Sequence, residues 1–397
     1  MSTRPSGNPR RSTRPLNVPE TLIGRVLDGR FRLDKVLSSG GMGIVFEATQ
    51  LSIQRKVAVK LLKPTLSADG ELIQRFMQEV NVVATLQHPN IVATVDAGKD
   101  ASGLAYLVME FFDALTFRQM LQRFELTLPE ILDVFAQVCS ALTEAHAAGI
   151  IHRDLKFENI MLKRMHDGRV HVKILDFGVA KLIHSDANLT RGGQVPGTPG
   201  IIAPELVDGL APTPQSDLYS LGVLLFTTLS GQAPYRGEND LALMHAHKTK
   251  PLPDLAEMVH KDVPRALTNF ALKLMEKTPQ KRPQDAQVVQ ETVEHLRYAA
   301  PSALAKNPYV PPSLMGDQGK KSDVRRRAFV VGHVEGDSSV EERVRDQEAI
   351  EADFASALNA NESTPILVPS SVTVALVFVL IGLVLLCITM IYRIFFG

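Results

Sequence analysis

The stretch HRDLKFEN, residues 152–159, places an acid, two cations and an amide between two short apolar runs. Ile150 and Ile151 precede it, and Ile160 to Leu162 follow it. Charged side chains are costly in a core unless they are paired. The pattern therefore predicts a loop held by two strand-like anchors at the edge of a cleft, with Asp154, Lys156 and Asn159 as candidate functional residues.

A glycine-rich stretch, LSSGGMGIV at residues 37–45, lies between two segments that alternate as strands do. Glycines at positions 40, 41 and 43 would let backbone N–H groups approach phosphate oxygens closely. No lysine follows the last glycine and no helix begins there, so the stretch is not a P-loop.

The next alternating segment, VAVK, carries a lysine in the middle of a strand pattern. Alternation places Ala58 and Lys60 on one face of the strand, opposite Val57 and Val59. A lysine that points into a cleft needs an acidic partner, because a lone buried ammonium is costly. Glu79 is the candidate partner, because it lies on the helix that follows. Apolar residues recur at helical period between residues 69 and 86 and predict that helix.

Strand patterns dominate residues 27–112, and helical patterns dominate from residue 116 onward. The helical patterns cover residues 129–148, 216–231, 241–248 and 264–296. The sequence therefore predicts an α+β chain, with a small β-rich lobe containing one helix and a larger, mostly helical lobe.

Two further motifs, DFG at residues 176–178 and GTPGIIAPE at 197–205, complete an ordered series with the glycine loop, VAVK, Glu79 and HRDLKFEN. This order is the signature of protein kinases. Over residues 28–296 the sequence resembles the eukaryotic-type (Hanks-type) protein kinases, and in particular the bacterial membrane-anchored serine/threonine kinases. The resemblance implies a bilobal protein-kinase fold over residues 28–298 that transfers the γ-phosphate of ATP to Ser/Thr of proteins.

The resemblance also implies the roles of the charged residues. Asp154 would accept the proton of the substrate hydroxyl, and Lys156 would neutralise the γ-phosphate during transfer. Lys60, paired with Glu79, would hold the α- and β-phosphates. Asn159 and Asp176 would bind Mg²⁺ (or Mn²⁺) through oxygen ligands.

The remaining residues of the implied ATP site belong to the glycine loop, the walls around the adenine and the hinge, where Met109 is the gatekeeper. They are Leu37, Ser38, Gly40, Gly41, Gly43, Val45, Ala58, Met109, Glu110, Phe112 and Met161, with Leu162 as the alternative to Met161.

Regulatory and structural roles follow from the same resemblance. Arg153 would bind a phosphate on the activation loop, with Thr190 as the first candidate for phosphorylation and Ser185 as the second. Thr198 would contact the catalytic Asp and Lys. Two structural sites complete the set: Glu205 would form a buried ion pair with Arg282, and Asp217 would brace the backbone of the catalytic loop.

Three residues depart from the family pattern. Ser38 replaces the first glycine of the loop, which predicts altered nucleotide affinity. Phe157 replaces the usual proline of the catalytic loop and removes no catalytic group. Ile201 replaces the usual aromatic residue before APE, which leaves substrate specificity open.

Two other functions remain as alternatives: a pseudokinase scaffold with this fold but no turnover, and a small-molecule phosphotransferase. Lys and Arg together number 43, as do Asp and Glu. This balance argues against a nucleic-acid partner. The two cysteines, Cys139 and Cys387, offer no disulfide framework and favour a reducing compartment.

The ends of the chain differ from its middle. Residues 1–27 read as a disordered basic tail, residues 299–365 as a flexible linker and residues 393–397 as a short tail. Residues 366–392 are predicted to be a transmembrane helix, because 372–392 are 21 residues without a charge, enough to span roughly 30 Å. We expect a single-pass anchor in a bacterial inner membrane.

The kinase domain is expected in the cytoplasm, where ATP and protein substrates are found, and a homodimer is expected for autophosphorylation in trans. Flanking charge argues the other way. Residues 346–365 contain no Lys or Arg, whereas Arg393 follows the span. Large folded domains are translocated or retained largely irrespective of that rule, so the cytoplasmic assignment is kept as the prediction.

Overall fold

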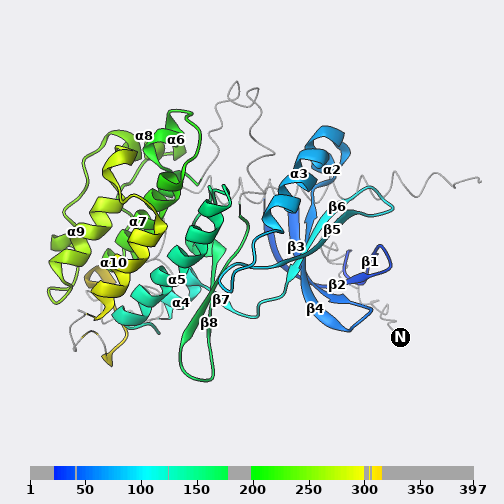
Figure 1. Ribbon diagram of the computed structural model, residues 1–397, viewed down its shortest axis with the longest axis horizontal. Helices are drawn as coiled ribbons and strands as arrows, with labels where there is room; N and C mark the ends of the chain where they lie inside the picture. The colour runs from blue at the N-terminus through cyan, green and yellow to red at the C-terminus, as the bar shows by residue number, and fades with distance from the viewer. Residues whose placement is uncertain are drawn as a thin grey trace, which may run out of the picture.

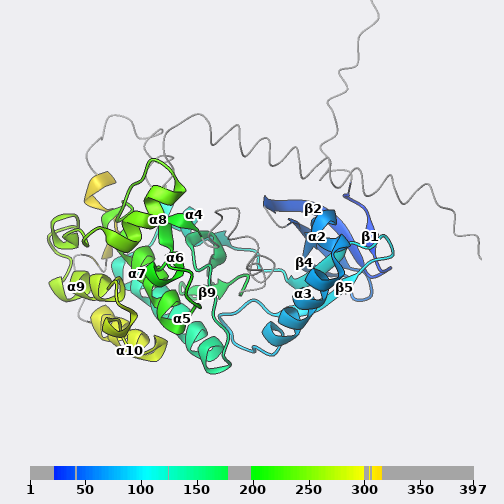
Figure 2. The same cartoon turned by 90° about the horizontal axis from the view of Figure 1, so that it is seen from above.

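The computed structural model describes residues 22–40, 43–123, 125–177, 198–298, 304 and 306–314. Two lobes lie side by side, a strand-rich lobe built from the first part of the chain and a helical lobe built from the rest (Figures 1 and 2). The family fold class predicted from the sequence, with a small β-rich lobe before a larger helical one, is therefore observed.

A six-stranded sheet forms the small lobe, in the order β1-β2-β3-β4-β6-β5, with antiparallel neighbours throughout. Val57 and Val59 pack on one face of it with Phe46, while Ala58 packs on the other face, as the alternation predicts. The strands are β1 (Val26–Leu27), β2 (Phe31–Gly40), β3 (Gly43–Gln50), β4 (Arg55–Leu62), β5 (Thr94–Lys99) and β6 (Ala105–Glu110).

Helix α3 (Gly70–Val83) covers the second face of this sheet. The Asp69 carboxylate accepts a hydrogen bond from the Leu72 N–H and caps the helix, and Phe76 and Val80 are its buried residues. The predicted helix is thus confirmed. A short helix, α2 (Pro64–Ala68), precedes it, so the prediction of one helix in this lobe is incomplete. Pro64 starts α2 because its fixed φ suits a first helical turn.

The large lobe is built around α7, which is buried along nearly its whole length. Its helices are α4 (Phe117–Gln122), α5 (Leu128–Ala147), α6 (Pro204–Val207), α7 (Pro214–Ser230), α8 (Asp240–Thr249), α9 (Arg265–Leu274) and α10 (Ala286–Tyr298). The single helical pattern predicted for residues 264–296 is in fact two helices. Pro279 and Pro283 lie between them, around the 3₁₀ turn η6 (Pro279–Lys281), because proline interrupts helical hydrogen bonding.

A small antiparallel sheet at the junction of the lobes carries the candidate site. Its strands are β7 (Leu115–Thr116), β8 (Ile160–Arg164) and β9 (Val170–Ile174). The stretch HRDLKFEN runs from the end of α5 into β8 and includes the 3₁₀ turn η1 (Phe157–Asn159). The loop predicted between two apolar anchors is therefore present, and β9 leads directly to Asp176.

Residues 306–314, assigned to the linker by the sequence, pack against the large lobe. Tyr309 is 5% exposed, and its hydroxyl donates to the Leu229 carbonyl oxygen at 2.7 Å. The Ser313 hydroxyl donates to the Ser230 carbonyl oxygen at 2.6 Å. The packed body therefore extends beyond residue 298, the boundary that the helical pattern predicts.

Among the residues with described structure, no helix has the length and apolar composition needed to cross a bilayer. The span predicted at residues 366–392 lies outside those residues, as do the tails and most of the linker.

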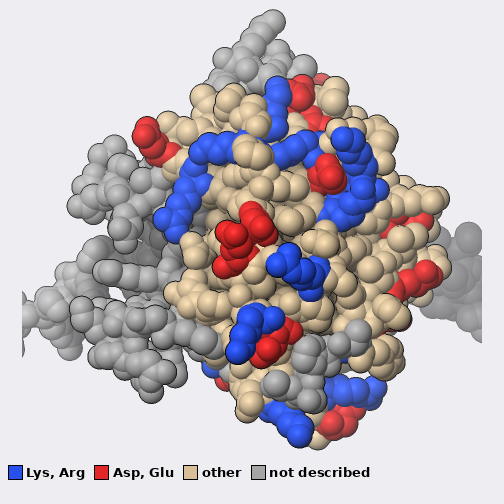
Figure 3. All heavy atoms as spheres, turned by 90° about the vertical axis from the view of Figure 1, so that its left-hand side faces the viewer, with Lys and Arg blue, Asp and Glu red and all other residues tan. Residues whose placement is uncertain are grey.

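The far end of the large lobe, formed by α8, α9 and α10, carries charges of both signs (Figure 3). Lys and Arg side chains follow an arc across this face, and Asp and Glu lie within and beside it. This face therefore lacks the uniform positive field that a nucleic-acid surface needs.

Candidate active site

Asp217 of α7 holds the start of the catalytic loop. Its carboxylate accepts the backbone N–H groups of His152 at 2.8 Å and Arg153 at 2.9 Å, and lies 2.9 Å from Nε2 of His146. Burial disfavours the ionised form of Asp217, but the hydrogen bonds from His146 and the loop outweigh it and lower its pKa. The bracing role predicted for Asp217 therefore has its geometry in this structure.

The backbone of Arg153 adopts a φ of +66°, in the left-handed region that non-glycine residues seldom occupy. Asp176, at the other side of the site, has a φ of +55°. Such strain is held in place by surrounding contacts and occurs often at functional sites.

The predicted catalytic residues converge on Asp154. Lys156 Nζ lies 2.7 Å from one carboxylate oxygen of Asp154, and the Thr198 hydroxyl donates to the other at 2.8 Å. The Asn159 side-chain amide donates to the Asp154 carbonyl oxygen at 2.8 Å. Thr198 is far away in sequence, so its position brings the GTPGIIAPE segment to the catalytic loop.

Lys60 is paired with Asp176 and not with Glu79, which corrects the predicted pairing. Its ammonium lies 2.9 Å from the Asp176 carboxylate, and Lys60 is 9% exposed. Glu79 is half-buried on α3; burial raises its pKa, while the positive charge of Arg153 acts in the opposite direction. The sequence could require an acid for Lys60 but could not choose between the carboxylates of Glu79 and Asp176.

Asn159 and Asp176 have oxygen atoms suited to a metal ion. The Asn159 nitrogen donates to Asp154, which leaves its amide oxygen as an acceptor, and Lys60 contacts one oxygen of Asp176. The backbone joins the two residues, since Leu175 N–H donates to the Asn159 carbonyl oxygen at 2.8 Å. Hard oxygen donors of this kind fit Mg²⁺. Among the described residues there is no cluster of three or more His, Cys, Asp or Glu that could hold a metal.

The walls predicted for the adenine lie on adjoining strands. Ala58 pairs with Met109 across β4 and β6, and Val45 pairs with Lys60 across β3 and β4. Met161 lies on β8, beside Leu162, which is fully buried. The prediction that these residues form one wall stays a prediction, because a shared sheet places them together without identifying a ligand.

The hinge contains a charge contact that the sequence did not reveal. The Glu110 carboxylate accepts the Ala93 N–H at 2.9 Å and binds the ammonium of Lys173 at 2.5 Å. The same lysine lies 5.9 Å from the centre of the Phe112 ring. The Glu110 side chain thus ties the hinge to β9, and no local motif could have indicated a partner so distant in sequence.

The glycine loop is a β-hairpin, with Gly40 opposite Gly43 and Ser38 opposite Val45. A Cβ atom at Gly43 would lie 2.0 Å from the Leu61 carbonyl oxygen, so only glycine fits there. Leu37 is 43% exposed at the mouth of the hairpin. Gly41 lies outside the described residues.

The other two departures from the family pattern are both packed into the core. Phe157 is 1% exposed, with the Phe117 ring at 5.4 Å and the Arg118 guanidinium 5.2 Å from its ring centre. Ile201 is 3% exposed, and its carbonyl oxygen accepts the Ser220 hydroxyl at 3.0 Å. Phe157 therefore replaces proline as a packing residue.

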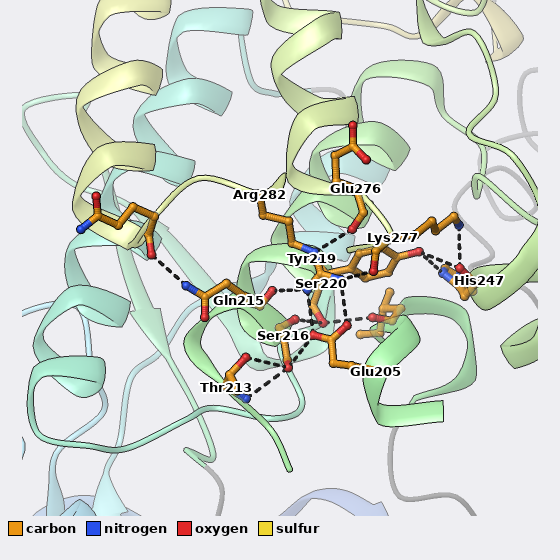
Figure 4. A network of polar contacts seen from close by, with 12 residues as sticks. Glu205, Thr213, Gln215, Ser216, Tyr219, Ser220, His247, Glu276, Lys277 and Arg282 are labelled. Atoms are coloured by element: carbon orange, nitrogen blue, oxygen red, sulfur yellow. Dashed lines mark hydrogen bonds and ion pairs between the residues drawn. The ribbon is translucent and has the colours of Figure 1, made fainter. Parts of the chain in front are cut away.

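Glu205 and Arg282 form the predicted buried ion pair (Figure 4). Both guanidinium nitrogens lie 2.8 Å from the carboxylate oxygens, and Ser216 donates to the same carboxylate at 2.8 Å. Burial opposes ionisation, yet Arg282 and Ser216 lower the pKa of Glu205. Thr190 and Ser185, the regulatory candidates, lie outside the described residues, so the predicted role of Arg153 stays a prediction.

Comparisons with known proteins agree with this geometry. The protein kinase domain model matches residues 31–312. Serine/threonine-protein kinase pkn3 of Myxococcus xanthus is 34% identical over 279 residues, which are 68% of this chain and 51% of that protein. Serine/threonine-protein kinase PknA of Mycobacterium tuberculosis is 40% identical over 238 residues, 59% of this chain and 54% of that protein. The chain thus spans about half the length of these curated relatives.

Solved structures agree on the fold. The crystal structure of the Mycobacterium tuberculosis PknI kinase domain superposes with a TM-score of 0.54 at 24% identity, covering 69% of this chain and 98% of that one.

Removal of Arg282 should reveal the cost of its buried partner. We expect Arg282→Met to lower the free energy of unfolding by about 3–5 kcal/mol near neutral pH, because Glu205 would stay buried without its cation. In the native protein the pKa of Glu205 is lowered, so its contribution is present above the unfolded-state pKa of about 4.3 and is lost as the pH falls. In the variant the largest remaining influence on the Glu205 pKa is burial, which raises it, so the stability deficit should shrink on acidification.

Urea unfolding of both proteins at about pH 7 and about pH 5 measures this deficit. Arg169→Met is the matched control, because Arg169 pairs with Asp167 on the surface and its side chain is 85% exposed. An equal deficit at both pH values would contradict the argument.

Proposed function

The chain belongs to the protein kinase family, and on that premise we propose that it transfers the γ-phosphate of ATP to serine or threonine residues of proteins. The observation that carries the proposal is the convergence of Lys156, Thr198 and Asn159 on Asp154. These residues belong to two separate segments, and a structural role alone gives no reason for four polar side chains to meet there. The named serine/threonine kinases among its relatives support the same substrate class.

Each of these residues has a chemical task in the proposed reaction. Asp154, held by Lys156 and Thr198, would orient the substrate hydroxyl and take its proton as the phosphorus–oxygen bond forms. Lys156 would then neutralise charge on the transferring phosphoryl group. Lys60 would hold the non-transferred phosphates of ATP. Mg²⁺, bound by Asn159 and Asp176, would supply charge neutralisation between the phosphates.

The catalytic role of Asp154 can be tested directly. We expect the full chain, incubated with labelled ATP, Mg²⁺ and myelin basic protein, to label the protein, and Asp154→Asn to reduce the rate at least about a thousandfold, because the proton acceptor is lost. Asp167→Asn is the control, since Asp167 lies in the β8–β9 turn away from the site and should behave as the native protein does.

Other outcomes separate the alternatives. Nucleotide binding without transfer in the presence of either metal would favour a pseudokinase scaffold. Transfer to small alcohols but not to protein would favour a small-molecule phosphotransferase. Mass spectrometry of the labelled sample locates autophosphorylation, which we expect first at Thr190 and next at Ser185.

We further propose that activation exchanges the partner of Lys60. In this structure Lys60 is paired with Asp176, and Glu79 lies under the influence of Arg153. A phosphate at Thr190 would attract Arg153 and withdraw its positive charge from Glu79. Glu79 would then be available for Lys60, and Asp176 for Mg²⁺. A homodimer would allow one copy to phosphorylate the other.

Glu79→Gln tests this exchange. We expect the rate of transfer to fall about tenfold or more, because the amide cannot hold the ammonium of Lys60 in place. Thermal stability should be unchanged or higher near neutral pH, since burial raises the pKa of Glu79 and thus disfavours its charged form in the fold. Glu71→Gln is the control, because its side chain on the same helix is 86% exposed. An undiminished rate in Glu79→Gln would rule out the exchange.

The apolar run at residues 372–392 supports a further proposal, that the kinase domain is anchored to the inner membrane with its active site in the cytoplasm. We expect the full chain to sediment with membranes and a chain truncated after residue 365 to remain in the supernatant. Protease added outside intact spheroplasts should leave the kinase domain whole, and lysis should expose it. Cleavage of the kinase domain without lysis would reverse the proposed orientation.

A further inference from the structure

His247 of α8 lies beneath the segment that brings Thr198 to Asp154. This segment contains the 3₁₀ turn η4 (Pro199–Ile201), and α8 packs against it. Both Gly200 and His247 are buried, the latter with an exposed fraction of 0%. The imidazole is therefore enclosed between helices and the segment. Figure 4 shows two of its polar neighbours, Tyr219 and Lys277.

Two tyrosines hold the imidazole in place. The Tyr219 hydroxyl lies 3.0 Å from Nδ1 of His247, and the Tyr235 ring meets the imidazole edge-on at 4.9 Å. Tyr219 in turn carries the Arg282 guanidinium over its ring, 4.9 Å from the centre. Contacts thus run from the buried Glu205–Arg282 ion pair through Tyr219 to His247.

The surroundings keep the imidazole neutral. Burial and the nearby ammonium of Lys277 lower the pKa of His247 to about 3, while the backbone of Gly200 acts in the opposite direction. Lys277 donates to the His247 carbonyl oxygen at 2.6 Å and to the Tyr235 hydroxyl at 2.8 Å. Because the Lys277 ammonium is fixed beside the ring, its charge opposes a second proton on the imidazole.

The hydrogen bonds also assign the tautomer. The Tyr219 proton has a better acceptor in Nδ1, at 3.0 Å, than in the His247 carbonyl oxygen, at 3.5 Å. A neutral imidazole that accepts at Nδ1 carries its own proton at Nε2. Within the described part of the chain, Nε2 is buried and has no partner within normal hydrogen-bond geometry, although the Gly200 backbone lies near enough to raise the pKa of the imidazole as a weak acceptor does. A buried donor left in this way costs free energy, so it favours any rearrangement that supplies an acceptor.

We propose that His247 is a positioning residue for protein-substrate binding, and that the weak contact between its Nε2–H and the Gly200 backbone carbonyl becomes a full hydrogen bond when the substrate occupies the segment 198–202. The inference rests on the proposed kinase function, and it takes the segment 198–202, which begins with Thr198 beside Asp154, as the place where the substrate peptide binds. Gly200 is the expected acceptor, because its backbone already raises the pKa of the imidazole. Ser220 fixes the next carbonyl, that of Ile201, so α7 and α8 would together set the shape of the segment.

Substituting His247 by each of two amide residues tests the two imidazole nitrogens separately. His247→Asn keeps an oxygen near the position of Nδ1 for the Tyr219 hydroxyl but has no donor at the position of Nε2. His247→Gln places an amide N–H near Nε2. We therefore expect His247→Asn to raise the KM for myelin basic protein about three- to tenfold, the effect of one lost hydrogen bond, with the KM for ATP unchanged. His247→Gln should stay within about twofold of the native protein in both constants.

The split between the two KM values distinguishes positioning from folding. A variant that is merely destabilised has a smaller active fraction, which lowers kcat and leaves both KM values as they were. Thermal unfolding of each variant measures that fraction independently. Tyr219→Phe adds a second readout: without the Tyr219 proton the imidazole can shift its own proton to Nδ1, so the KM for the protein substrate should again rise.

The remaining outcomes overturn the inference. Equal KM values for the protein substrate in His247→Asn, His247→Gln and the native protein would do so, as would a parallel rise in the KM for ATP. Failure of the native protein itself to label myelin basic protein would instead remove the proposed kinase function, and the inference with it.

Discussion

The buried carboxylate of Asp217 is the contact on which the candidate site depends. It is 1% exposed, a position where a charge is costly unless hydrogen bonds compensate it. The compensation comes from His146 and from the backbone of His152 and Arg153. The same bonds hold Arg153 at its positive φ, so the charge and the strain support each other. Asp154 follows directly, and its orientation is therefore set from the core of the large lobe.

The small lobe is connected to the catalytic loop's surroundings by the Lys60–Asp176 ion pair, which is easier to exchange than the hydrogen bonds of Asp217. Lys60 belongs to β4, and its partner Asp176 follows β9, so the ion pair joins the lobes. In the proposed exchange, the carboxylates of Asp176 and Glu79 would compete for one buried ammonium. Replacing one such partner by another leaves the number of buried charges unchanged, so the free-energy difference between the two pairings is small compared with either pair's desolvation cost. On that proposal, a single phosphate on the activation loop would shift the balance.

The sequence predicts well what depends on residue type and order. The alternation around Ala58, the helix over Glu79 and the loop at 152–159 are all observed, and resemblance supplied the meeting of Asp154 with Thr198. The sequence predicts poorly the contacts that depend on competition between groups far apart along the chain. The partner of Lys60, the Glu110–Lys173 contact and the packing of Tyr309 each follow from three-dimensional proximity, for which the sequence holds no local signal.

Phe157 shows how packing can replace a backbone constraint. Proline at this position would fix φ and reduce the freedom of the unfolded loop. Phenylalanine leaves φ free, but its buried ring contacts Phe117 and Arg118 of α4, and Arg118 also binds the Glu158 carboxylate. Phenylalanine thus restrains the loop through contacts in the folded state, whereas proline would restrict the unfolded chain. Because α4 begins directly after β7, which pairs with β8, this packing also connects the catalytic loop to the chain that leaves the hinge.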